Sequence, residues 1–341
     1  MKPIFFLLLP LLFLSCPDDD LPPSVSGINL TPASGLLILN EGPFRQSLAS
    51  LSFYSNVSGQ VQQDLFRLVN GYGLGDILNS ALLVDDQLLL IVNNSSIIER
   101  VGQRSLVSNA SVDLESPRYA LALPDGDIYV SDFTAQEIHV LAGGEDLRKY
   151  KSIPLPGWSE NMVLANGLVY VTNPFRDYLY LIDPDQDVVT DSILIEPQCG
   201  AMVSDEAGNI WALCLGDNIL DNQAKLYRIS PDRQAIDSWP LVASGQSRLL
   251  YVEATQEIWL LSFEGLYRWS ANWPAGQNLG EPWLARAGNW YALGRQPSTG
   301  NIFLGDALDF QRRGMVYQFT DSGTAVDSFE VGIGPNSFIF Y

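Results

Sequence analysis

Five amide or carboxylate side chains recur at one position of a repeated, strand-like segment. The seven copies read SGLLILN, QLLLIVN, GDIYVSD, GLVYVTN, GNIWALC, QEIWLLS and GNIFLGD, and successive copies start 39 to 53 residues apart. Their last letters are Asn40, Asn93, Asp132, Asn173, Cys214, Ser262 and Asp306. Short polar side chains at a strand end either cap the following turn or, gathered on one rim, bind a polar ligand or a metal. Both interpretations fit this spacing.

Aromatic and charged residues surround these strand ends. The loops after them carry Glu41, Phe133, Phe175, Arg176, Phe263 and Phe310, and the loops entering the preceding strands carry Arg118, Tyr119, Trp158, Glu160, Gln198, Arg248 and Trp290. Aromatic rings, amides and arginines gathered at one opening are typical of a ligand or partner site. We therefore expect these residues, together with Asn40, Asn93, Asp132, Asn173 and Asp306, to form a ligand-binding face. We expect no catalytic residue and no cofactor.

The strands that must position these residues recur with the same period. An apolar run such as RYALAL (118–123) precedes most copies, and a third strand such as EIHVL (137–141) follows each copy. Helical periodicity is nowhere sustained, and steps of this length are typical of propeller blades with four short strands. The sequence predicts an all-β fold over residues 34–341, a single seven-bladed β-propeller.

The two ends of the chain predict how the ring closes. The first copy, at Ser34, has no inner strand before it, whereas an unpaired strand, NSFIFY, ends the chain at 336–341. We expect this C-terminal strand to join the N-terminal blade and so remove the exposed edges. In a propeller, the loop entering each innermost strand and the loop leaving each second strand lie on one face, which would gather the candidate residues.

Composition excludes several classes of function. The formal net charge of -20 disfavours nucleic-acid binding, and no Gly-rich phosphate loop, nucleophile elbow or zinc spacing is present. The only histidine, His139, lies within a strand and is interpreted as a packed or surface residue. Cys199 and Cys214 fall on paired strands of one hairpin; a diagonal pairing, which we expect, would make a disulfide marginal in distance.

The N-terminus predicts export and lipid anchoring. MKPIFFLLLPLLFLSC has one lysine, a short apolar stretch and a small residue before Cys16, which indicates a signal peptide over residues 1–15. The ending FLSC resembles a bacterial lipobox, so Cys16 is expected to be acylated and residues 16–33 to form a flexible tether. The acidic run at 18–20 resembles a tag that sends lipoproteins to the outer face of the outer membrane. Acyl chains would provide the only contact with the membrane.

Several motifs resemble those of one class of propeller lipoproteins. YVTN at 170–173 resembles the YVTN/YncE-like repeat, and a wider resemblance lies in LILNEGPF with ASLSFY (37–54), DLFRLVNGYGLGDILNS (64–80), SPRYALA (116–122) and GIGPNSFIF (332–340). These segments look like surface lipoproteins of the class that includes the cobalamin-capturing BtuG proteins. That resemblance implies a binding protein that passes cobalamin, another corrinoid or a similar bulky polar nutrient to an outer-membrane TonB-dependent transporter.

Two other functions remain open at this point. Lactonase-type propellers hold a divalent cation in the channel, and Asn93, Asp132, Asn173 and Asp306 could mimic such a ring in a metal-dependent hydrolase. An interaction scaffold without a small ligand is the third alternative.

Overall fold

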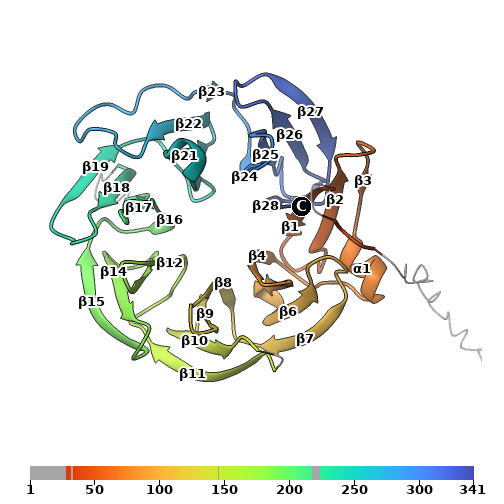
Figure 1. The fold of residues 1–341 in the computed structure, drawn as a ribbon, viewed down its shortest axis with the longest axis horizontal. Coiled ribbons are helices and arrows are strands. Elements are labelled where there is room, and N and C mark those ends of the chain that lie inside the picture. The colour runs from red at the N-terminus through yellow and green to blue at the C-terminus, as the bar shows by residue number, and fades with distance from the viewer. Residues whose placement is uncertain (1–27, 32–33, 145, 217–222) are drawn as a thin grey trace, which may run out of the picture.

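The computed structural model describes residues 28–31, 34–144, 146–216 and 223–341, and these form seven four-stranded antiparallel sheets arranged as a ring. Figure 1 shows the sheets as blades around a common centre, with the chain running once round the ring. The predicted all-β, seven-bladed propeller is confirmed. The signal peptide and Cys16 lie outside the described residues.

Each blade is built from strands that follow one another in the chain, except the blade that joins both termini. From the centre outward, the strands are β28 (Pro335–Phe340), β1 (Gly35–Asn40), β2 (Ser50–Ser55) and β3 (Val61–Gln62) in blade 1; β4 (Leu78–Val84), β5 (Gln87–Val92), β6 (Ile97–Gly102) and β7 (Ser108–Asp113) in blade 2; β8 (Pro117–Ala122), β9 (Asp127–Asp132), β10 (Glu137–Ala142) and β11 (Arg148–Pro154) in blade 3; β12 (Met162–Ala165), β13 (Leu168–Val171), β14 (Tyr178–Asp183) and β15 (Val188–Leu194) in blade 4. The remaining blades are β16 (Cys199–Ser204), β17 (Ile210–Cys214), β18 (Lys225–Ile229) and β19 (Ile236–Pro240) in blade 5; β20 (Arg248–Val252), β21 (Glu257–Ser262), β22 (Gly265–Ser270) and β23 (Leu284–Ala285) in blade 6; β24 (Trp290–Arg295), β25 (Ile302–Asp306), β26 (Met315–Phe319) and β27 (Ala325–Glu330) in blade 7.

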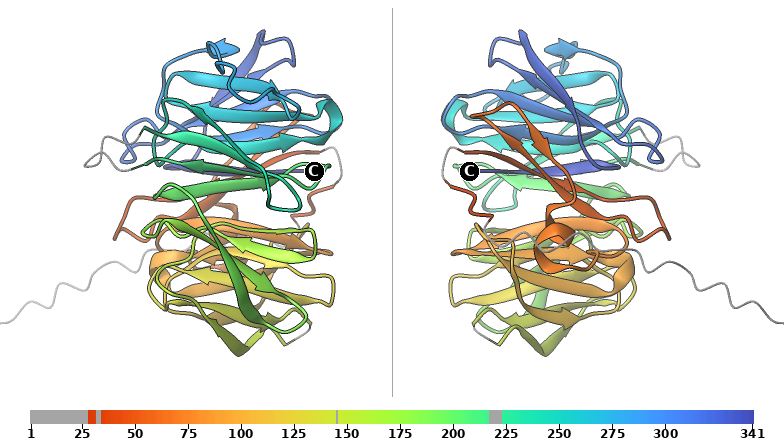
Figure 2. Two further views of the ribbon diagram at one scale, coloured as in Figure 1. Left: turned by 90° about the vertical axis from the view of Figure 1, so that its left-hand side faces the viewer. Right: turned by 90° about the vertical axis from the view of Figure 1, so that its right-hand side faces the viewer.

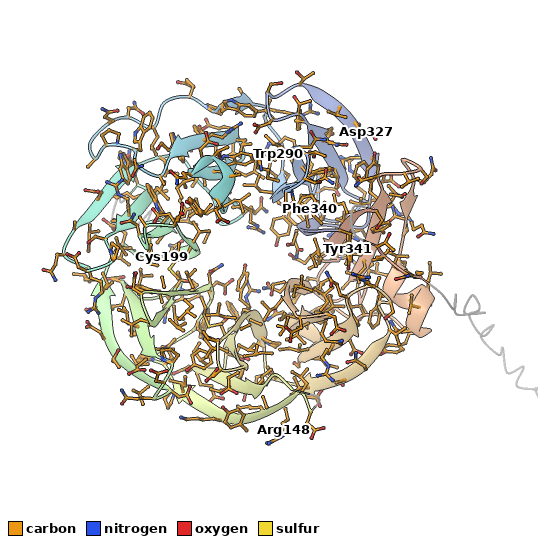
Figure 3. All side chains as sticks on the ribbon, viewed as in Figure 1. Arg148, Cys199, Trp290, Asp327, Phe340 and Tyr341 are labelled. Atoms are coloured by element: carbon orange, nitrogen blue, oxygen red, sulfur yellow. A yellow bond between two sulfur atoms is a disulfide. The ribbon has the colours of Figure 1, made fainter. Side chains whose placement is uncertain are left out.

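The C-terminal strand closes the ring as predicted. β28 pairs antiparallel with β1, so that Phe340 lies opposite Leu36 and Phe338 opposite Ile38. The Tyr341 amide also donates to the Gly35 carbonyl at 3.0 Å. Figure 3 shows Phe340 and Tyr341 at this junction. The pairing removes two exposed strand edges at once, one from each end of the chain.

The second strand of each blade is the most deeply buried, because it lies between two neighbouring sheets. Every residue of β1, β17 and β25 is buried, whereas the outer strand β27 is exposed at all positions but one. Apolar side chains on both faces of the second strands fill the spaces between blades. The edge-on views show the strands of each blade running between the two faces of the ring (Figure 2).

Helical structure is confined to short pieces. The long segment between the first two repeats contains α1 (Leu65–Asn70), whose Leu65 and Phe66 are fully buried against blade 1. Two 3-10 turns, η1 (Asn93–Ser95) and η2 (Glu253–Thr255), lie elsewhere in the chain. No helix in the described ranges has the length and apolarity needed to cross a membrane. Within the segment predicted to be a tether, Leu30 is buried and its amide donates to the Arg104 carbonyl at 2.9 Å.

Candidate ligand-binding mouth

The start of each innermost strand and the end of each second strand lie on one face of the ring, here called the mouth face. The Cα pairs that define it are Asn40–Pro335, Leu78–Val92, Pro117–Asp132, Met162–Val171, Cys199–Cys214, Arg248–Leu261 and Trp290–Asp306. The loops that follow and precede these residues therefore surround the same opening, as the repeat predicted.

The recurring polar strand ends hold these loops in place. Each forms hydrogen bonds with nearby protein groups: Asn40 Nδ2 donates to Ser52 Oγ at 2.9 Å, Asn93 Nδ2 to the Pro117 carbonyl at 3.0 Å, Asp132 Oδ2 accepts from the Ser116 amide at 2.7 Å, Asn173 Oδ1 from the Phe175 amide at 3.0 Å, and Asp306 Oδ1 from the Leu308 amide at 2.9 Å. Asn40, Asp132, Asn173 and Asp306 are buried. Asp132, Asn173 and Asp306 thus cap the turns that follow them, which is one of the two interpretations that the sequence left open, whereas Asn40 bonds within its own blade and Asn93 bonds to the neighbouring blade.

An aromatic wall stands at blades 3 and 4. The ring of Trp158 lies 4.3 Å from that of Phe133 and 4.0 Å from that of Phe175, measured between centroids. The Phe175 side chain is 61% exposed, and the Arg118 guanidinium lies 5.6 Å from the centroid of Phe133. Three loops that are distant in sequence supply this wall, which offers an apolar surface beside a cation.

A bidentate ion pair lies next to the wall. Arg118 Nε donates to Glu160 Oε2 at 3.0 Å and Arg118 Nη2 donates to Glu160 Oε1 at 2.5 Å. Burial opposes the charged form of Arg118, but Glu160 outweighs burial and raises the pKa of the guanidinium. Arg118 therefore stays ionised, and the Glu160 carboxylate beside it compensates its charge.

Glu41, Arg248 and Tyr291 form a second polar group, towards blade 7. Together with Tyr119 and the Arg118–Glu160 pair they are called the polar floor. The Tyr291 hydroxyl donates to Glu41 Oε2, and the Arg248 guanidinium lies 4.4 Å from the centroid of the Tyr291 ring. Burial raises the pKa of Glu41, although Tyr291 and the two arginines act in the opposite direction. Burial also raises the pKa of Tyr119 on the same floor.

Two neighbouring cavities lie among these residues. The mouth cavity, of about 990 Å³, is bounded by the aromatic and apolar side chains Phe133, Phe175, Leu194, Ile195 and Tyr227 and by Arg118, Glu160 and Gln198. The central cavity, of about 260 Å³, is bounded by Asn79, Ser80, Tyr119, Glu160, Asn161, Ser247, Arg248 and Asn336. Glu160, Gly200 and Gly245 border both. A large cavity with a mixed apolar and polar lining thus lies beside a smaller cavity lined mainly by polar residues.

β-Bulges aim several of these side chains into the opening. The register shifts directly after the first pair of the inner strand in five blades: between Pro335 and Ser337, Leu78 and Ser80, Pro117 and Ala120, Cys199 and Met202, and Trp290 and Ala292. The residues within these shifts include Asn79, Arg118, Tyr119, Gly200 and Tyr291. Because a bulge inserts an extra residue, it turns a side chain away from the regular alternation of the strand.

A family model described as a domain of unknown function, DUF5074, matches residues 34–244, more than half of the chain. The chain belongs to the DUF5074 family. A search of curated proteins finds no match to this DUF5074 member.

Solved structures similar to the DUF5074 chain share its fold at low identity. A quinonprotein alcohol dehydrogenase-like protein from Bacteroides thetaiotaomicron is 16% identical, with a TM-score of 0.69 over 90% of this chain and 78% of that one. A putative 6-phosphogluconolactonase from Bacteroides fragilis is 10% identical, with a TM-score of 0.62 over 90% and 98%. A virginiamycin B lyase from Staphylococcus aureus is 12% identical, with a TM-score of 0.55 over 87% and 96%. These likenesses show a shared propeller fold.

The structure brings together part of the predicted site. Of the candidates, Arg118, Tyr119, Phe133, Glu160, Phe175, Gln198 and Arg248 border the two cavities, Trp158 completes the wall, and Glu41 and Phe310 contact Tyr291. Arg176 and Phe263 are exposed on neighbouring loops of the DUF5074 propeller. Trp290 was wrongly placed at the rim: it is buried between blades, and its Nε1 donates to the Arg286 carbonyl at 2.7 Å.

Sequence reasoning missed other residues of the opening, above all Tyr291, Asn161, Ser247 and Asn336. Tyr291 directly follows Trp290, so the alternation of side chains along a strand was the available signal. A third hollow, of about 830 Å³, lies around Trp269 and Leu279 of blade 6 and is bordered by none of the predicted site residues.

The proposed metal ring is not assembled in the part of the chain that the structure describes. Asn93, Asp132, Asn173 and Asp306 bond to loop groups of their own or a neighbouring blade, and no group of three or more His, Cys, Asp or Glu side chains among the described residues could hold a metal ion.

A disulfide joins Cys199 and Cys214 at the edge of the mouth (Figure 3 labels Cys199). The expected diagonal pairing was wrong, because the two residues lie directly opposite each other before the bulge of β16. The disulfide therefore ties the start of an inner strand to the end of its neighbour.

Replacing both cysteines by alanine is expected to lower the free energy of unfolding by about 3 kcal/mol, because the bond closes a loop of 15 residues in the unfolded chain. Urea unfolding followed by circular dichroism measures this change. Wild-type protein treated with a dithiol reductant is the control and should unfold at the same urea concentration as the variant. An unchanged unfolding midpoint in both samples would contradict the prediction.

Proposed function

We propose that the mouth captures a bulky, uncharged nutrient that is rich in hydrogen-bonding groups, with cobalamin or another corrinoid as the specific candidate. The observation that carries the proposal is the pairing of a wide, partly aromatic cavity with a polar floor whose charges compensate each other. Arg118 is neutralised by Glu160, and Arg248 lies close to the Tyr291 ring that is bonded to Glu41. An ionic ligand would have to compete with the Arg118–Glu160 ion pair, whereas an uncharged one would not.

A corrinoid has chemistry that complements this opening. It is a large ring system fringed with amides, so its apolar faces suit the wall of Phe133, Trp158 and Phe175, and its amides suit the donors and acceptors below. The exposed ring of Phe175 provides contact area that the folded protein itself does not use.

We further propose that the protein works outside the cell as a lipid-anchored binding protein rather than as an enzyme. The predicted signal peptide, the lipobox-like Cys16 and the predicted tether support an outer-membrane lipoprotein, and the disulfide is typical of an oxidising compartment. The motif resemblance to BtuG-class lipoproteins supports transfer of the ligand to a TonB-dependent transporter. Transfer requires a face that both ligand and transporter reach, and the mouth face is the candidate.

The proposal is tested by incubating purified protein with cyanocobalamin and separating the mixture by gel filtration. Coloured ligand is expected to co-elute with the protein at an equimolar ratio. Colour that elutes only with free ligand at micromolar protein concentration would overturn the corrinoid proposal. A stoichiometric divalent metal in the same purified protein would instead support the hydrolase alternative.

Replacing Phe175 by alanine is expected to weaken cyanocobalamin binding about tenfold without changing stability, because this ring is mostly exposed in the free protein. Phe44 on a loop of blade 1 is similarly exposed, at 59%, and borders neither cavity, so Phe44→Ala is the matched control. Equal affinities for wild type and Phe175→Ala, measured by fluorescence quenching, would move the binding site away from the wall.

A further inference from the structure

The only histidine of the chain lies behind the mouth, on the third strand of blade 3. His139 is 1% exposed, and its Nε2 lies 3.0 Å from Asp132 Oδ2. Asp132 is the strand-end residue of the same blade and is itself fully buried. Neither residue touches the two cavities.

Asp132 ties together the two loops that blade 3 contributes to the mouth. Its carboxylate accepts from the Ser116 amide at 2.7 Å on the entry side and from the Thr134 and Ala135 amides at 2.8 Å on the exit side. The Phe133 amide adds a bond to the Ser116 carbonyl at 2.9 Å. Ser116 lies two residues before Arg118, so the same carboxylate orients the loop of Arg118 and the loop of Phe133.

The surroundings determine what His139 does for this carboxylate. Burial alone would raise the pKa of Asp132, but the hydrogen bonds from His139 and the three backbone amides hold it well below the ordinary value. An ionised carboxylate only accepts, so Nε2 carries the proton and donates. On the other side of the ring, Nδ1 lies 3.0 Å from Glu137 Oε1 but makes no hydrogen bond, and Glu137 is held by Lys149 at 2.5 Å and by Ser152 Oγ at 2.8 Å.

We propose that His139 is a positioning residue of the mouth: by donating to Asp132, it fixes the loops that carry Arg118 and Phe133. Its effect on ligand affinity rests on the proposed function, whereas its effect on the loops does not. A purely structural histidine would contribute to global stability without a selective effect on these two loops.

The test compares three variants. His139→Leu removes the donor but leaves Asp132 with its backbone bonds, so the blade retains most of its support. His139→Gln restores a donor. Asp205→Ala is the matched control: Asp205 is also buried, accepts from Trp211 Nε1 and the Asn209 amide at 2.9 Å, and lies in the hairpin between β16 and β17 on the opposite face.

Two measurements are made on each variant. Amide hydrogen exchange, followed by mass spectrometry, reports opening of peptides 114–120 and 131–137. Gel filtration with graded cyanocobalamin reports affinity. In His139→Leu, exchange in both peptides is expected to rise about tenfold or more and affinity to fall about tenfold, because a hydrogen bond to a charged buried group is lost. His139→Gln should recover most of both effects, and Asp205→Ala should change neither.

The outcomes separate the two claims. Unchanged exchange in both peptides of His139→Leu overturns the positioning role, whether or not any ligand binds. Faster exchange spread evenly over all seven blades also overturns it, because that pattern reports global destabilisation. Selective exchange in a protein whose wild type retains no cyanocobalamin supports the positioning role and contradicts the corrinoid proposal.

Discussion

Truncation of the chain after Gly334 is expected to leave no folded protein. The removed segment contains β28, which pairs with β1 along its length and whose Phe338 and Phe340 pack against Phe303. Losing a buried phenylalanine costs about 3–5 kcal/mol. Phe338 and Phe340 are half-buried, but they are lost together with the whole β28–β1 pairing, so the combined cost approaches the roughly 5–15 kcal/mol that stabilises a typical domain. Circular dichroism and gel filtration should show an unfolded or aggregated chain.

A circular permutant provides the control for this truncation. The Tyr341 amide bonds to the Gly35 carbonyl, so a short turn can join Tyr341 to Ser34 while the chain is opened after Val331. The permutant carries every strand and is expected to fold and unfold cooperatively. A truncated chain that folds as well as the permutant would contradict the role assigned to β28.

Replacing Arg118 by leucine is expected to lower the free energy of unfolding by about 3 kcal/mol, because Glu160 is then left buried without its partner. The side chains of Arg118 and Glu160 are only 23% and 12% exposed, so solvent compensates little for the loss. Ligand affinity is expected to fall at least tenfold, since the guanidinium beside the Phe133 ring is removed as well. Urea unfolding and cyanocobalamin titration measure the two effects.

The double variant Arg118→Leu with Glu160→Leu separates stability from binding. Removing both charges is expected to restore stability to within about 1 kcal/mol of wild type, because no uncompensated charge stays buried. Affinity should remain low. Recovery of affinity in the double variant would show that the pair serves the fold alone.

The fold could be predicted from the sequence because the repeat carries redundant information. GLVYVTN and its counterparts are apolar on both faces, as strands between two sheets must be, and polar turns separate them at a nearly constant period. The unpaired NSFIFY strand supplied the seventh innermost strand, so that each of the seven blades has one. The short helix α1 escaped prediction because six residues are too few for a helical period to stand out.

The candidate site could be predicted only in part, because bulges change the direction of side chains by one position. Trp290 was assigned to the rim as a residue of an entry loop, but it is the buried first residue of β24, and the register shift that follows it leaves Tyr291 bonded to Glu41. The same kind of shift in β16 follows the Cys199–Cys214 pair and leaves the cysteines directly opposite each other. Long-range pairs such as Arg118 with Glu160 depend on the packing of two blades, which no local pattern encodes.

The most direct measurement is a calorimetric titration of cyanocobalamin into wild-type protein and into Gly200→Trp. Gly200 borders both cavities, and a Cβ placed there would meet no atom within 4 Å, so a tryptophan should block the mouth without disturbing the strand. Gly144→Trp, on the hairpin between β10 and β11 and equally free of contacts, is the control. We predict one-to-one binding with micromolar or tighter affinity for wild type and the control, and no heat of binding for Gly200→Trp. Absence of binding to wild type, or equal binding to all three proteins, would contradict the assignment of the mouth as the capture site.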